Sequence, residues 1–209
     1  MKKSVMDAKK ARLLALASTM LEQKGYQQLK VAELARAGSV SISTVYAIFG
    51  SKEGIYLAYI ESKIAALLEA IDGIADEDPV LQLKQYAGFI FGTLEQGRIV
   101  LEEGVRNNPL FFNALSNEFS QSAKKIHSFL TACFAKINPG LEKEQTDLLV
   151  YIFSGQLHGY MQYWVVAGGN PLALAEQLCE TFICQTKGCY PYAQGKDAEA
   201  KGGSDENRM

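Results

Sequence analysis

Apolar positions along the chain recur at steps of three and four residues, the period of a helix with one buried face. The first such segment predicts a helix over residues 8–24, which Gly25 follows at a position suited to a helix C-cap. Its buried face is expected to consist of Leu13, Leu16, Ala17, Met20 and Leu21.

Three further helices are predicted before residue 72. A short one lies around Val31–Ala35 and ends at a break over residues 37–40 that contains a permissive glycine. Ser41 is a natural N-cap for a helix over residues 42–49. Gly50 and Ser51 end that helix, and Ser51 caps a longer one that runs from residue 52 toward residue 71.

The rest of the chain is also expected to be helical. After an acidic, Gly- and Pro-containing linker over residues 72–79, each break pairs a helix stop with a proline that can begin the next helix. The predicted segments are 80–103, 109–116, 118–137, 143–167 and 171–188. No segment shows sustained strand alternation, so the predicted fold class is all-α. We expect three regions: residues 1–52, residues 53–190 and a disordered tail over residues 191–209.

Composition narrows the class of protein. Of the 209 residues, 48% are apolar and 21% are charged, which is ordinary for a globular protein. No apolar stretch is long enough for a membrane span, and no signal core follows the basic N-terminus, so the cytoplasm is the expected compartment and no membrane partner is expected. Residues 1–63 hold 10 Lys/Arg and 5 Asp/Glu, a net charge of +5 on a chain whose total is −2. A basic end on an acidic body suggests contact with a polyanion.

The first 55 residues contain a helix-turn-helix pattern, the unit that places its second helix in the DNA major groove. In the helix over residues 42–49, Val45, Ile48 and Phe49 can pack inward. The residues left facing outward are Ile42, Ser43, Thr44, Tyr46 and Ala47. Hydroxyl groups suit phosphates and base edges, and small apolar groups can contact a thymine methyl.

The run from Ala37-Gly38 through Ser43-Thr44-Val45-Tyr46 to Phe49-Gly50-Ser51-Lys52-Glu53-Gly54-Ile55 resembles the DNA-binding domain of TetR/AcrR-family transcriptional regulators. The resemblance implies a three-helix DNA-binding domain, a connecting fourth helix and a larger helical domain that dimerises and binds an effector. It implies contacts with double-stranded DNA: phosphate contacts from Thr44, Tyr46 and Lys52, and base contacts around Ser41–Ala47, which include Ser41, Ile42, Ser43 and Ala47. Lys10, one of the basic residues near the N-terminus, is expected to add to the phosphate contacts. The turn is one residue longer than is usual in the family, at Ser39, and Lys30 stands where a Thr or Ser cap is usual.

A dimer interface is predicted on the segment 148–166, which is hydrophobic nearly all round and must be covered on every side. One of its faces has a flat strip at Gly155 and Gly159, and a helix over 171–188 is expected to pack with it. The predicted homodimer interface comprises Leu148, Ile152, Gly155, Gly159, Tyr163, Leu174, Leu178 and Phe182. The alternative reason for the glycines is crowding within one chain.

A small-molecule effector site is predicted among the aromatic residues beyond residue 85, most of which must belong to the core. Its candidate residues are Phe89, Arg106, Phe111, Phe112, Tyr151, His158 and Trp164. Their chemistry suggests an apolar or aromatic effector. The function expected is therefore a dimeric repressor that an effector releases from a palindromic operator.

No cofactor, metal site or catalytic group is expected, because the sequence has no P-loop, nucleophile elbow or paired metal-ligand motif. An enzyme is therefore not predicted. Cys179, Cys184 and Cys189 are five residues apart, a spacing that does not put thiols on one helix face, and they are read as structural. Two alternatives stay open: a helical small-molecule-binding protein that does not use DNA, and a thiol-based redox sensor.

Overall fold

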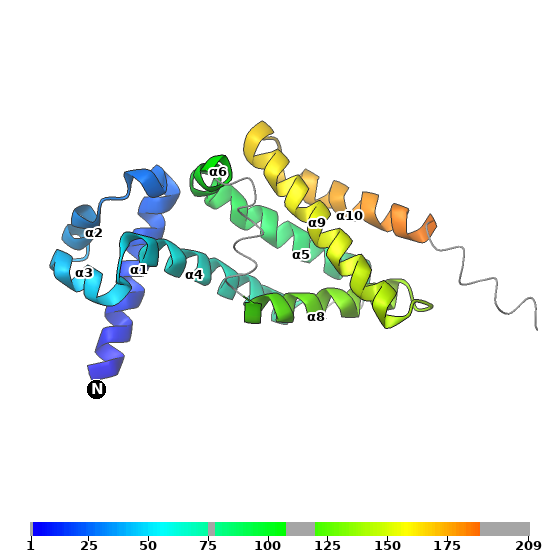
Figure 1. Cartoon of the computed structure of the whole chain (residues 1–209), viewed down its shortest axis with the longest axis horizontal. Helices are drawn as coiled ribbons and strands as arrows, with labels where there is room; N and C mark the ends of the chain where they lie inside the picture. Colours follow the sequence, from blue (N-terminus) through cyan, green and yellow to red (C-terminus); the bar gives the residue numbers. More distant parts are fainter. Residues whose placement is uncertain (1, 75–77, 108–119, 189–209) are drawn as a thin grey trace, which may run out of the picture.

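The computed structural model describes residues 2–74, 78–107 and 120–188, and within these ranges it contains helices and no strand (Figure 1). The helices are α1 (Lys2–Gln28), α2 (Val31–Ala37), α3 (Ile42–Phe49), α4 (Lys52–Gly73), α5 (Pro79–Gln96), α6 (Arg98–Asn107), α8 (Ser120–Ile137), α9 (Lys143–Ala167) and α10 (Pro171–Gly188). The all-α class is confirmed.

The N-terminal unit, called the head here, consists of α1, α2, α3 and the first half of α4 (Figure 1). Its core is formed by apolar side chains that the helical period places on the inner faces of these elements. The least exposed members are Leu13, Ala17, Leu21, Leu34, Val45 and Ile55. Short helices such as α2 and α3 are marginal alone, so this shared core is what holds them in place.

The body consists of the second half of α4 with α5, α6, α8, α9 and α10 (Figure 1). Helix α10 lies along α5, and α9 crosses the same bundle. Three fully buried rings meet at its centre: the Phe134, Phe153 and Phe182 ring centroids are 5.1–5.5 Å apart, and two of the three pairs are edge-on.

Helix α4 belongs to both units. Ile55 and Ile60 are buried in the core of the head, whereas Ile71 is buried in the core of the body. Tyr56 packs against both cores. The domain boundary expected after residue 52 stays a prediction. The two turns of α4 that follow this residue pack in the core of the head.

Several helix limits predicted from the sequence match closely, among them those of α3, α9 and α10. The single helix expected over 80–103 is wrong, because α5 ends at Gln96 and α6 begins at Arg98. A Cβ at the intervening Gly97 would lie 2.8 Å from the Tyr59 hydroxyl, so the closeness of α4 requires glycine there. The helix expected over 109–116 and the tail over 191–209 lie outside the described residues.

The first helix is longer than predicted and kinked. It covers Lys2–Gln28, with Gly25 at φ 81° and ψ 173° inside it. Gly25 therefore takes the positive φ expected of it, but the chain resumes a helical turn afterwards. No helix in the described ranges is both long and apolar enough to cross a membrane.

The turn between α2 and α3 reverses the roles expected of its residues. Gly38 has an ordinary helical conformation, and Ser39, the additional residue, carries the positive φ of 53°. Glycine is needed at 38 for space: a Cβ there would overlap the Leu13 side chain and lie 3.2 Å from the Leu34 carbonyl oxygen.

We expect Gly38→Ala to destabilise the head by about 1–3 kcal/mol, because the new methyl group displaces the buried Leu13 side chain. Urea denaturation followed by circular dichroism measures the loss. Gly73→Ala is the matched control, since a Cβ there meets nothing within 4 Å. Equal stability of the two variants would contradict the packing described for the turn.

Candidate DNA interface and effector pocket

Helix α3 presents one face to solvent. Ser41 caps it, because its hydroxyl accepts a hydrogen bond from the Thr44 N–H at 3.2 Å. Val45 is fully buried, whereas Ile42 and Tyr46 keep 46% and 45% of their surface exposed. Ser43 and Ala47 are exposed as well. The structure therefore brings the residues predicted to face DNA onto one open surface.

Three hydroxyl groups at the start of α3 form a connected network. The Ser41 Oγ lies 2.8 Å from both the Ser43 Oγ and the Thr44 Oγ1. Hydroxyls of this kind donate and accept, so they can turn from one another to phosphate oxygens or base edges. This face offers small polar groups and two apolar side chains, Ile42 and Tyr46, to a partner.

Lys52 lies at the first turn of α4, next to this face. Its ammonium group donates to the Gln27 carbonyl oxygen at 3.1 Å and lies 4.6 Å from the Tyr26 ring centroid. The negative end of α1 thus offsets the unfavourable position of a cation at the N-terminus of α4. The Tyr26 hydroxyl donates to Glu53 at 2.8 Å, and burial, then that carboxylate, raises the pKa of Tyr26 to about 12. Lys10 is exposed on α1.

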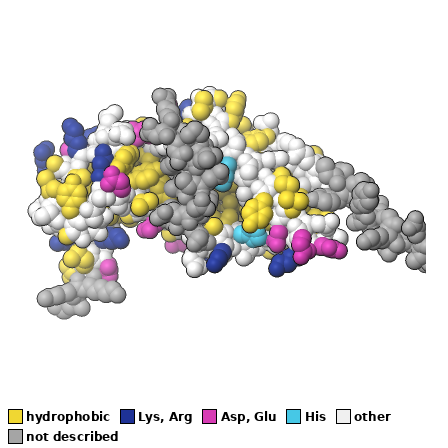
Figure 2. All heavy atoms as spheres, in the orientation of Figure 1, with side chains coloured by type: hydrophobic (Ala, Val, Ile, Leu, Met, Phe, Trp, Pro, Cys, Tyr) yellow, Lys and Arg dark blue, Asp and Glu magenta, His cyan; other side chains and the backbone are white. Residues whose placement is uncertain are grey.

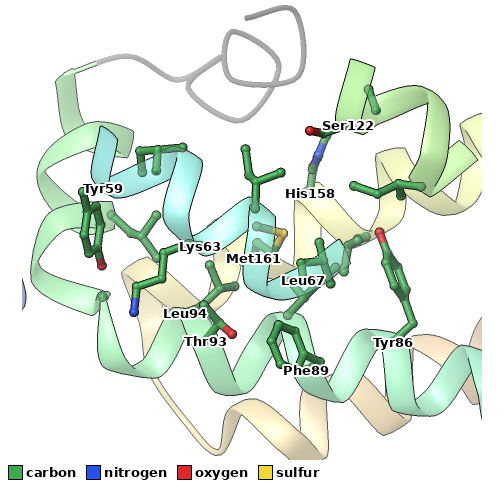
Figure 3. Close-up of a pocket in the computed structure, with 18 residues that line it drawn as sticks. Tyr59, Lys63, Leu67, Tyr86, Phe89, Thr93, Leu94, Ser122, His158 and Met161 are labelled. Atoms are coloured by element: carbon green, nitrogen blue, oxygen red, sulfur yellow. The ribbon is translucent and has the colours of Figure 1, made fainter. Parts of the chain in front are cut away.

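An apolar cavity of about 220 Å³ lies in the body between α4, α5, α8 and α9 (Figure 3). Tyr59 and Lys63 lie at one end of it, and Tyr86 and His158 lie at the other. Burial lowers the pKa of His158, so a neutral imidazole faces the cavity at pH 7. Burial also raises the pKa of Tyr86, which keeps its phenol protonated. The wall thus combines a mostly apolar lining with a few polar groups, as small-molecule sites do.

The predicted effector residues meet this cavity only in part. Phe89 and His158 line it. Tyr151 is 70% exposed and lines a larger hollow between α8 and α9, which shares part of its wall, including His158, with the cavity. The side chains of Arg106, Phe111 and Phe112 lie outside the described residues.

Trp164 is misplaced by the prediction. It is 1% exposed and lines neither hollow. Its indole N–H donates to the Gly169 carbonyl oxygen at 3.2 Å, and the Arg98 guanidinium lies 5.3 Å from its ring. Trp164 therefore holds the end of α9 against the loop that follows it, which is a structural contact.

The contribution of α4 to the cavity was not predicted from the sequence. Tyr59, Lys63 and Leu67 line the wall at four-residue spacing, one face of a helix. The same helix uses another face in the head, so its sequence shows two overlapping apolar faces and a lysine between them. These two apolar faces were the feature of the sequence from which the role of α4 in the cavity could have been predicted.

Helix α6 joins the body to the head. Val100 is buried in the core of the head, and Leu101 lines the cavity. The Glu103 carboxylate accepts hydrogen bonds from the backbone N–H groups of Tyr26 and, at 3.3 Å, Gln27. It occupies the space at Gly25 that a Cβ would need. The kink of α1 is therefore completed by a side chain of the body.

The outer face of α9 is open in the single chain. Leu148, Ile152 and Tyr163 are 51%, 43% and 60% exposed. Gly155 and Gly159 are exposed, and a Cβ at either would meet nothing within 4 Å. Crowding within the chain therefore does not explain these glycines. Figure 2 shows hydrophobic side chains exposed where α9 crosses the body.

The prediction that α10 contributes Leu178 and Phe182 to this face is wrong. Both are buried in the core of the body, at 0% and 1% exposure, where α10 packs along α5. Leu174 is partly buried against the same core. The apolar residues that recur along α10 therefore pack against α5 and the core of the same chain.

Buried thiols explain two of the four cysteines. Burial raises the pKa of Cys133 to about 11 and that of Cys179 to about 12, so both stay protonated and unreactive. Cys184 is exposed and free, and Cys189 lies outside the described residues. Within the described part of the chain, no group of His, Cys, Asp or Glu side chains could hold a metal ion.

Comparisons with known proteins agree with the head described above. Residues 13–59 match the family model of bacterial regulatory proteins, tetR family. An uncharacterized HTH-type transcriptional regulator, YvkB of Bacillus subtilis (strain 168), is 26% identical over 174 residues, which cover 79% of this chain and 88% of that protein.

Solved structures share the fold of most of the chain. A tetR-family transcriptional regulator from Streptomyces coelicolor has a TM-score of 0.68 and 17% identity, covering 93% of this chain and 86% of its own. The fatty acid degradation regulator FadR from Bacillus halodurans has a TM-score of 0.65 and 20% identity, covering 84% and 94%. FadR from Bacillus subtilis, solved in complex with stearoyl-CoA, has a TM-score of 0.64 and 19% identity, covering 83% and 97%.

The head, in which α2 and α3 form the helix-turn-helix unit and α3 is exposed, defines a helix-turn-helix transcriptional regulator. Residues 13–59 carry the DNA-binding domain of the tetR family of these regulators. The family and these relatives are regulators of transcription rather than enzymes.

The Glu103 contact generates a prediction. Glu103→Gln replaces a charged acceptor by a neutral one, so we expect the Tyr26 and Gln27 amides to exchange with solvent about tenfold faster, a change of ~1.4 kcal/mol. Hydrogen exchange resolved by mass spectrometry or NMR measures the rates. Glu95→Gln, on the exposed side of α5, is the control. Unchanged exchange at both amides would show that the carboxylate does not hold the kink.

Proposed function

We propose that the protein is a dimeric regulator that binds a palindromic DNA operator as a repressor and leaves it when a small apolar effector occupies the cavity of the body. The observation that carries the proposal is the open face of α3, where polar hydroxyls and two apolar side chains surround a buried Val45 anchor. A helix held by its inner face and exposed at its N-terminal outer face suits the major groove.

The proposed DNA contacts divide into two kinds. We propose that Ser41, Ile42, Ser43 and Ala47 contact base edges, and that Thr44, Tyr46, Lys10 and Lys52 contact phosphates. Since Ser41–Phe49 contains no Lys or Arg, bidentate contacts to guanine do not come from this helix. Discrimination among sequences therefore relies on hydroxyl contacts, thymine methyl groups and DNA shape.

We expect Lys52→Ala to weaken binding to all duplexes to a similar degree, by about tenfold, because one phosphate contact is lost. The slope of log affinity against log salt should fall by about 1. Fluorescence anisotropy over a salt series measures both, on a duplex that the protein selects from a random pool and on an unrelated duplex.

Lys125→Ala removes an equal charge from the body, where Lys125 pairs with Asp72 at 2.7 Å, and serves as the control. Thermal unfolding verifies that the variant head is intact, since Lys52 also contacts Gln27. A loss confined to the selected duplex would contradict a phosphate role for Lys52. Salt-independent binding by the unaltered protein would contradict the DNA-binding proposal as a whole.

Dimerisation is proposed through the outer face of α9. A row of exposed apolar side chains with two open glycines allows the equivalent helix of a second copy to approach closely. Two heads held in this way would meet successive turns of the major groove on one side of the DNA. The proposed interface keeps Leu148, Ile152, Gly155, Gly159 and Tyr163 and omits the buried residues of α10.

Ile152→Glu and Tyr163→Glu are each expected to dissociate the dimer at micromolar concentration, because they place a charge in an apolar contact. Both residues are exposed in the single chain, so the helical content should not change. Sedimentation velocity measures the oligomeric state. Leu81→Glu, at a 40% exposed site on α5, is the control and should stay dimeric. Dimers that survive both α9 substitutions would place the interface elsewhere.

An apolar effector is proposed for the cavity between α4, α5, α8 and α9 because its wall is largely apolar. The structural neighbour solved with stearoyl-CoA supports a molecule with a long acyl chain. The effector changes DNA affinity if it binds more tightly to one arrangement of the head than to another. Residues of both α4 and α6 line the cavity, and both helices also contribute to the core of the head.

A further inference from the structure

Lys63 faces two ways. Its side chain lines the cavity at the end nearest the head (Figure 3). Its ammonium group also forms an ion pair with the Glu22 carboxylate of α1 at 2.8 Å, and each side chain is 26% exposed. The Tyr59 hydroxyl donates to the same Glu22 oxygen at 3.4 Å. One lysine is therefore part of the cavity wall and of the contact between the body and the head.

The charge of the cavity is concentrated at this end. Among the described residues that line it, Lys63 alone carries a permanent positive charge, and none carries a negative one. Tyr86 and His158, at the far end, are neutral at pH 7. Between the two ends lie apolar side chains such as Leu67, Phe89 and Met161. A molecule that fills this space meets an apolar channel with a cation at one end.

Glu22 competes for that cation. An anionic group placed beside Lys63 from the cavity would be attracted by the ammonium and repelled by the Glu22 carboxylate. The lysine has a flexible stem, so it can turn from one carboxylate to another anion. Glu22 would then keep only its weaker contact with Tyr59, in a partly buried position where an unpaired charge is unfavourable.

We propose that the effector is an amphipathic anion, with its apolar tail in the cavity and a carboxylate or phosphate at Lys63, and that it acts by taking Lys63 from Glu22. This inference rests on the proposed function for its effect on DNA, and it adds the chemical class of the effector and the contact that responds to it. Loss of the ion pair removes one polar contact that fixes α1 against the middle of α4, while the apolar core of the head stays in place. Effector binding and DNA binding then oppose each other by linkage.

Three probes with one tail test the class of effector: dodecanoate, dodecyl phosphate and dodecan-1-ol, each below its micellar concentration. Isothermal titration without DNA measures their affinity for the full chain. Both anions, or one of them, should bind at least about tenfold more tightly than the alcohol. Comparison of the two anions distinguishes a carboxylate from a phosphate headgroup. Equal binding of all three, or binding of none, overturns the proposal.

Two substitutions of Lys63 test its role in binding the anion. Lys63→Met keeps the apolar stem and should lose the preference for the anion while it binds dodecan-1-ol as before, and Lys63→Arg should restore the preference. Lys84→Met is the matched control, because Lys84 is also a partly buried lysine, paired with Glu180 at 3.1 Å, but lies outside the cavity wall. An unchanged preference in Lys63→Met overturns the assignment.

Glu22→Gln tests the coupling. It removes the competitor, so the anion should bind as tightly or more tightly, and its effect on affinity for the selected duplex should shrink from about tenfold toward none. If the anion still lowers the DNA affinity of this variant as much as that of the unaltered chain, the ion pair is not the responding contact. DNA affinity without probes is measured separately, so failure to bind DNA refutes the proposed function while the titrations still decide the ligand class.

Discussion

One continuous helix anchors two cores in this molecule. The first turns of α4 bury Ile55 and Ile60 in the head, and its later turns bury Ile71 in the body. A hydrogen-bonded helix transmits rotation and translation along its length because it does not bend freely. The body therefore cannot repack around α4 without moving the surface that α3 exposes. Lys63 and Leu67, in the middle of this helix, line the cavity wall, so α4 connects an internal site with the head.

A second connection restrains the same joint from the other side. Helix α6 places Val100 in the core of the head and Leu101 at the cavity, and its Glu103 carboxylate completes the kink at Gly25. Two attachments define an orientation more narrowly than one, since a single contact still leaves rotation about itself. The position of the head thus reflects both α4 and α6, and both border the same cavity.

Local rules explain what the sequence predicted well. The Ser41 cap, the buried Val45 and the solvent-facing Ile42 and Tyr46 follow from helix periodicity and capping, which act within a few residues. What failed depended on contacts distant in sequence. Gly97 interrupts the predicted helix at a place where the Tyr59 hydroxyl leaves little room for a Cβ, and Leu178 and Phe182 face inward because α10 packs along α5. The cavity escaped prediction for the same reason: Lys63 belongs to it only once α4, α5, α8 and α9 are assembled.

The side chain of Lys52 has two partners in the unbound molecule: its ammonium group lies over the Tyr26 ring and donates to the Gln27 carbonyl oxygen. A free lysine gives up roughly 1.5–2 kcal/mol of rotamer entropy when it is fixed. Here the two contacts restrict the side chain on folding, so an arriving phosphate meets an ammonium group that needs less further ordering than a free lysine does. Association at this position should accordingly be governed by enthalpy and released counterions more than by the freezing of a flexible arm.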